Sequence, residues 1–133
     1  MQTIVVGYDG SESADRALDR ATELIENGGS VVLVSAIHLL AGKGSMGYDP
    51  VEKENFDQQL DVARDRLAEA GIAATTVEGI GDPARVIAAE AKQTNADLIV
   101  VGNSHKNMLE RLLFGSVSGS VAHRAECAVL VIP

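Results

Sequence analysis

The chain has 133 residues, a length that fits a single domain over residues 1–133 with a substantial hydrophobic core. Apolar residues make up 46% of it and charged residues 23%, as is typical of a soluble globular protein. The net charge of −8 argues against nucleic acids and anionic membranes as partners, because both require basic surfaces.

The first part of the chain predicts a strand, a helix and a second strand. Thr3–Gly7 is a short apolar run with β-branched residues, which is typical of a strand covered on both faces. After the "YDGS" break, apolar residues recur at helical spacing; they are Ala14, Ala17, Leu18, Ala21, Leu24 and Ile25. Asn27–Gly29 is expected to end this helix, because glycine accepts a left-handed backbone. Val31–Ile37 is a second buried strand.

A glycine-containing loop over Leu39–Pro50 precedes the next two elements. A helix is predicted over Val51–Ala70, and its inward face is formed by Phe56, Leu60, Ala63 and Leu67. Ala73–Glu78 is a more polar strand, so we expect it near an edge of the sheet.

The last part of the chain begins with a clear helix start, in which Asp82 is the N-cap and Pro83 the first helical residue. The apolar stripe of this helix is Ala84, Ile87, Ala88 and Ala91. Leu98–Gly102 is a fourth buried strand, a loop and helix follow across Lys106–Ala125, and Ala128–Ile132 is a fifth strand.

This alternation of strands and helices predicts an α/β fold, with a five-stranded parallel sheet and helices on both faces. Ligands of such sheets bind beyond the carboxyl ends of the strands, where the strand order reverses. The rule points to Tyr8–Ser11, Ile37–Gly47 and Gly102–Ser118 as ligand-binding segments.

Two features of the sequence indicate the cellular compartment of the protein: its single cysteine and its lack of long apolar runs. Cys127 is the only cysteine, so no disulfide can form within the chain, which fits a reducing cytoplasm. No secretory leader precedes the first strand, and no apolar run approaches the roughly 18 residues of a membrane span. We therefore expect a cytoplasmic protein. Cys127 lies at the mouth of the last strand and is expected to be an inert, small apolar residue.

The sequence around Gly115 has the chemistry of an anion site. The first-turn amides of a helix have no intrahelical partner and carry partial positive charge, and a glycine allows a ligand to approach the backbone. Ser116 and Ser118 add hydroxyl donors. The alternative is structural: Ser116 caps a helix and Gly115 turns the chain.

Asp9 directly follows the first strand and also has two interpretations. Its carboxylate could accept hydrogen bonds from ribose hydroxyls or hold a metal. Alternatively, it is a turn or cap residue in "DGS".

Other motifs are weaker. The segment 79–84 resembles a dinucleotide fingerprint, but it follows the third strand and Pro83 removes an amide, so we interpret it as a turn and helix start. The three histidines lack metal-ligand spacing, and no Ser-His-Asp arrangement is legible, so we assign no metal-binding or catalytic residue.

Three stretches together resemble the universal stress protein family over the whole chain. They are "IVVGYDGSESADRALDRA", "GDPARVIAAEAKQTNADLIVVG" and "FGSVSGSVAHRAECAVLVIP". The resemblance implies a doubly wound, adenine nucleotide α-hydrolase-like fold and a homodimer paired through the C-terminal strand, Ala128–Ile132.

One branch of the family binds ATP through a motif of Gly, two residues, Gly, nine residues, and Gly-Ser or Gly-Thr. Gly102 and Gly115-Ser116 match its spacing, but His105 stands at the second glycine. The nucleotide contacts that the resemblance and the binding segments imply are Tyr8, Asp9, Ala36, Ile37, Gly102, Asn103, His105, Gly115, Ser116, Val117 and Ser118.

The resulting hypothesis is a cytoplasmic regulatory dimer of the stress response that binds ATP with Mg²⁺ and an unidentified protein partner, without being an enzyme. The alternative is a family member that has lost nucleotide binding and acts as a dimeric interaction module. A third class is an enzyme or signalling domain on the same architecture. A phosphorylation receiver would need paired acids after the first strand, where this chain has only Asp9. A flavin protein would need aromatic residues to stack on the ring, and only 3% of this chain is aromatic.

Overall fold

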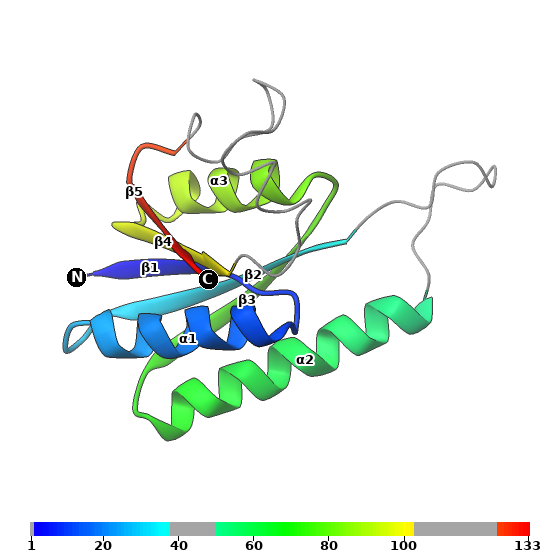
Figure 1. Cartoon of the computed structure of the whole chain (residues 1–133), viewed down its shortest axis with the longest axis horizontal. Helices are drawn as coiled ribbons and strands as arrows, with labels where there is room; N and C mark the ends of the chain where they lie inside the picture. The colour runs from blue at the N-terminus through cyan, green and yellow to red at the C-terminus, as the bar shows by residue number, and fades with distance from the viewer. Residues whose placement is uncertain (1, 38–49, 103–124) are drawn as a thin grey trace.

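The computed structural model describes residues 2–37, 50–102 and 125–133 of the chain (Figure 1). The loop predicted over 39–49 and the helix predicted over 106–124 lie outside these residues.

The described residues form a five-stranded parallel sheet in the order β3-β2-β1-β4-β5. Its strands are β1 (Thr3–Gly7), β2 (Ser30–Ile37), β3 (Ala73–Ile80), β4 (Leu98–Gly102) and β5 (Ala128–Ile132). The predicted fold class and all five strands are confirmed, with β2 one residue longer at its start and β3 longer at its end. β3 lies at an edge, as its polar composition indicated.

Helices cover both faces of the sheet (Figure 1). α1 (Glu12–Leu24) packs on β1, β4 and β5, and α2 (Pro50–Glu69) packs on β2 and β3 of the same face. α3 (Pro83–Gln93) covers the opposite face. The sheet therefore separates two apolar cores. The first contains Ile4, Val6, Leu18, Leu33, Leu67 and Val100, and the second contains Val5, Val34, Ile87, Ile99 and Val101.

Among the described side chains, which do not include that of Phe56, the helix faces follow the predicted spacing with one exception. Leu60, Ala63 and Leu67 of α2 are all buried, but Leu24 of α1 is 42% exposed, so its placement on the inward face was wrong. At 3.6 residues per turn, Leu24 lies at the flank of the stripe that Ala14 and its partners form. The buried face of α1 is therefore narrower than the set of apolar residues that the sequence suggested.

Two predicted element boundaries were also wrong. α1 ends at Leu24 with Ile25 as its cap, before Asn27–Gly29, and Gly28 takes its positive φ of 82° in the turn toward β2. Pro50 was assigned to the loop but begins α2. Proline is favoured in the first turn, where no intrahelical partner exists for an amide.

Among the described residues, no helix is both long enough and apolar enough to cross a membrane.

Candidate functional site

The carboxyl ends of β1, β2 and β4 lie side by side at one edge of the sheet. Gly7 of β1 pairs with Val34 of β2 on one side and Val101 of β4 on the other. The chain passes from β1 to β2 in one direction and from β3 across to β4 in the other. The strand order therefore reverses between β1 and β4, where doubly wound sheets bind ligands.

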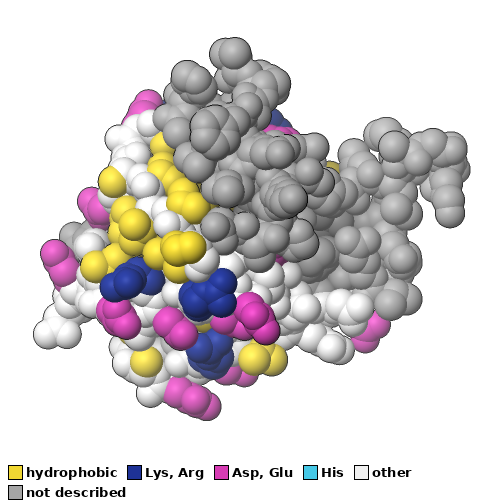
Figure 2. Space-filling view, viewed as in Figure 1, with side chains coloured by type: hydrophobic (Ala, Val, Ile, Leu, Met, Phe, Trp, Pro, Cys, Tyr) yellow, Lys and Arg dark blue, Asp and Glu magenta, His cyan; other side chains and the backbone are white. Residues whose placement is uncertain are grey.

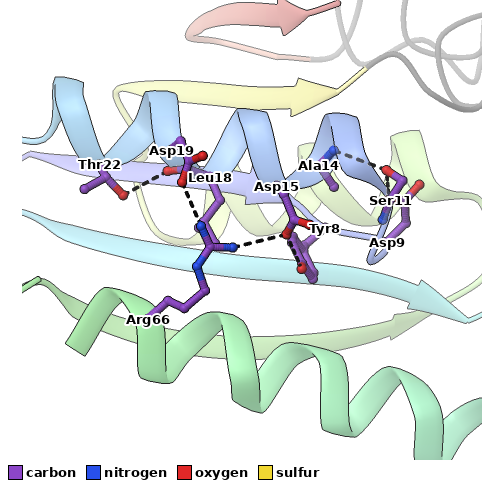
Figure 3. Close-up of polar contacts among 9 residues, drawn as sticks. All are labelled: Tyr8, Asp9, Ser11, Ala14, Asp15, Leu18, Asp19, Thr22 and Arg66. Atoms are coloured by element: carbon purple, nitrogen blue, oxygen red, sulfur yellow. Dashed lines mark hydrogen bonds and ion pairs between the residues drawn. The ribbon is translucent and has the colours of Figure 1, made fainter. Parts of the chain in front are cut away.

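Asp9 lies in the turn that joins β1 to α1 at this edge (Figure 3). Its Oδ1 accepts a hydrogen bond from the Ser11 amide at 2.9 Å and another from the Ser11 hydroxyl. Ser11 is the N-cap of α1, because its Oγ accepts from the Ala14 amide at 3.1 Å. The turn interpretation of Asp9 is thus confirmed, and the turn also holds the carboxylate in a defined place beside the point of reversal.

Tyr8 directs its side chain away from this edge, into the core between the sheet and the two helices. Tyr8 as a whole is 7% exposed, and its hydroxyl donates to Asp15 Oδ1 at 2.6 Å (Figure 3). Arg66 of α2 contacts the same oxygen at 3.3 Å and Asp19 at 2.8 Å. The Tyr8 amide donates to the Val34 carbonyl at 2.8 Å. Tyr8, a predicted nucleotide contact, therefore has its hydroxyl bonded to α1 and its amide bonded to β2.

Burial, with the hydrogen bond to Asp15 as the next cause, raises the pKa of Tyr8 above its usual value. In the unfolded chain tyrosine ionises near pH ~10, so above that pH the unfolded state loses a proton that the folded state keeps. Stability should therefore fall as pH rises above about 10, by at most about 1.4 kcal/mol per pH unit from this residue. Urea unfolding between pH 9 and 11 should show a shallower loss for Tyr8→Phe; parallel curves for the two proteins would contradict this account.

Gly102 ends β4 in direct contact with the first turn of α1. A Cβ built on Gly102 would lie 2.4 Å from Ser13 Oγ and 2.5 and 2.6 Å from the Ser13 carbonyl carbon and oxygen. Ser13 is fully buried, so the helix start cannot shift outward without opening the core. Glycine is thus required here by packing, whatever ligand the site takes. Sequence reasoning missed Ser13, since a serine in a helix start carries no signal of close contact with a distant strand.

The end of β2 projects beyond the end of β1. β1 pairs with β2 up to Val34, whereas β2 continues through Ala36 and Ile37, which pair with Gly79 and Ile80 of β3. The Tyr8 amide, which donates to the Val34 carbonyl, links the chain after β1 to β2, and the predicted role of Ala36 and Ile37 opposite a base stays a prediction.

The universal stress protein family model matches residues 1–133. The chain belongs to the universal stress protein family. A universal stress protein of Mycobacterium tuberculosis is 32% identical over 98% of this chain and 95% of its own length. A solved universal stress protein in complex with cAMP is 30% identical, with a TM-score of 0.72, and covers 99% of this chain and 97% of its own. The universal stress protein of Archaeoglobus fulgidus in complex with dAMP is 25% identical, with a TM-score of 0.74, over 100% and 98% of the two chains.

The other predicted contacts of this universal stress protein lie outside the described residues: Asn103, His105, Gly115, Ser116, Val117 and Ser118. The backbone of Ile37 is described, but its side chain is not. Within residues 2–37, 50–102 and 125–133, no group of three acidic, cysteine or histidine side chains is placed to hold a metal ion.

The first two residues of the fingerprint-like segment, Gly79 and Ile80, end β3, and the rest forms a turn and a helix start, as interpreted. Gly81 has a φ of 117°, and Asp82 caps α3 by accepting from the Arg85 amide at 3.2 Å. Burial raises the pKa of the half-buried Cys127 thiol, which disfavours the reactive thiolate and agrees with a structural role.

Proposed function

We propose that this universal stress protein binds an adenine nucleotide, ATP with Mg²⁺, at the carboxyl edge of its sheet. The observation that carries the proposal is the ordered Asp9 turn at the reversal of strand order, beside the projecting end of β2. Two solved relatives, described as complexes with cAMP and dAMP, support the choice of an adenine nucleotide.

Each part of the nucleotide is proposed to contact the end of a different strand. The Asp9 carboxylate accepts hydrogen bonds from the ribose hydroxyls, and the backbone of Ala36 and Ile37 faces the base. The phosphates, which carry Mg²⁺ with them, are assigned to the amides and hydroxyls from Gly102 onward, including Gly115 and Ser116. Backbone amides are suited to this acidic chain because they neutralise an anion without a basic cluster.

The nucleotide acts as a regulatory ligand in this proposal. Asp9 is engaged by Ser11, and the proposal assigns no residue as a base that activates water. Binding instead shifts the population of conformations, and so changes affinity for a protein partner in the cytoplasmic stress response.

The proposed homodimer pairs β5 of two chains. β5 is an edge strand of the described sheet and consists only of apolar residues, Ala128–Ile132. Figure 2 shows hydrophobic side chains gathered over this strand, next to a band of mixed charge over α1. An open apolar edge is a template for pairing with another strand, and pairing with a second copy would cover it.

Titration calorimetry with ATP and Mg²⁺ tests the proposal. Wild type is expected to bind. If the second glycine of the motif needs a left-handed backbone, a residue with a Cβ there costs roughly 1–2 kcal/mol, and His105→Gly should bind about tenfold tighter. Absence of binding heat from both proteins would contradict nucleotide binding. If sedimentation velocity then still showed a dimer, the alternative would hold: an interaction module without nucleotide.

A further inference from the structure

The side chain of Gln59 on α2 lies against the turn Asp9–Ser11, which follows β1 and is called the binding turn below. A Cβ built on Gly10 would lie 2.4 Å from Oε1 of Gln59, 2.5 Å from its Cδ and 2.7 Å from its Nε2. The whole amide group of Gln59 therefore lies against the α-carbon of Gly10. Gly10 stands directly between Asp9 and Ser11 and has a φ of 80°.

The turn is thus held from two sides. Asp9 and Ser11 are joined to each other and to the start of α1 by hydrogen bonds. Gly10 has no side chain of its own, and glycine is the residue with the widest range of backbone conformations. The Gln59 amide covers this residue from α2, and so restricts the part of the turn with the greatest intrinsic freedom.

We infer that Gln59 is a positioning residue for nucleotide binding, acting through Asp9. This inference rests on the proposed function. A carboxylate that is already oriented toward the ribose hydroxyls loses less conformational entropy when the ligand binds, so a contact that restricts the turn increases affinity. Gln59 comes from an element far from Asp9 in sequence, and the contact extends the binding site to α2.

Calorimetric titration with ATP and Mg²⁺ of Gln59→Ala and a matched control tests the inference. Gln58 is adjacent on α2, has the same chemistry and is also exposed, so Gln58→Ala is the control. Gln59→Ala is expected to weaken binding by about three- to tenfold, as for residues coupled by contact. Gln58→Ala should bind as wild type, and Gln59→Met, which keeps the length of the side chain, should restore most of the affinity.

The same titrations in an Asp9→Asn background distinguish positioning from direct contact. If Gln59 acts through the carboxylate, adding Gln59→Ala to Asp9→Asn should cause little further loss. An undiminished loss in that background, or equal losses for the alanine and methionine variants, would overturn the inference.

Wild-type affinity in Gln59→Ala would also overturn it, while the proposed nucleotide site would stand. If wild type itself gave no binding heat, the proposed function and the inference would both fall. Thermal unfolding of each variant shows that the compared proteins are folded.

Discussion

Replacing Gly102 by alanine is expected to lower the free energy of unfolding by about 3 kcal/mol. The added methyl group would stand 2.4–2.6 Å from Ser13, and two of the three atoms it meets belong to the backbone. Backbone cannot rotate away as a side chain can, so either β4 or the start of α1 must move. Because Ser13 is fully buried, that movement opens the core on one face of the sheet.

Gly71→Ala is the matched control for this measurement. Gly71 has a φ of 77°, but a Cβ built there meets no atom within 4 Å. The free energy of unfolding of Gly71→Ala should therefore fall only by the strain of a left-handed backbone, about 1 kcal/mol. Gly102 has no such φ, so its cost is steric. Urea unfolding of both variants separates the two effects, and a loss for Gly102→Ala no larger than for Gly71→Ala would contradict the packing account.

The packing role of Gly102 has a consequence for studies of binding. A variant at this position changes the junction of β4 and α1 as well as any phosphate contact. Loss of nucleotide affinity in Gly102→Ala would therefore not identify a ligand contact, and Asp9 is the better position for that purpose.

Asp9→Ala is expected to weaken nucleotide binding by about 10- to 100-fold. Hydrogen bonds to a charged group contribute about 1.5–3 kcal/mol each, and the carboxylate is proposed to accept them from the ribose. Asp9→Asn keeps an oxygen acceptor for Ser11 and so preserves the turn, but it replaces the charge and the second acceptor with a donor. Asp9→Asn should therefore show most of the loss of nucleotide affinity that is expected for Asp9→Ala. Calorimetry with ATP and Mg²⁺ measures both variants.

A change in net charge alone could alter the affinity for a polyanion, and Asp61→Asn controls for it. Asp61 is an exposed residue of α2 that contacts Arg64 at 3.3 Å. Its replacement removes the same charge from this acidic chain, so binding should stay equal or become slightly tighter. Wild-type affinity in Asp9→Asn would show that Asp9 serves only the turn.

Local patterns in the sequence were sufficient for the elements and the fold class. β-branched apolar runs predicted β1 and β4, and the Asp82-Pro83 pair predicted the start of α3. These signals are short-range, because strand burial, helix capping and glycine turns depend on neighbouring residues. The general rule for parallel sheets then placed Asp9 and Gly102 at one edge without further information.

Only the tertiary structure decided what these residues touch. Tyr8 was included among the ligand contacts as part of the segment Tyr8–Ser11 after the first strand. Alternation along an extended chain sends its ring into the core, toward Asp15 and Arg66. The contacts of Gly102 with Ser13 and of Gly10 with Gln59 join segments far apart in sequence. Such contacts depend on how closely a helix approaches a strand end or a turn, and that distance is set by the packing of the whole core rather than by any local pattern.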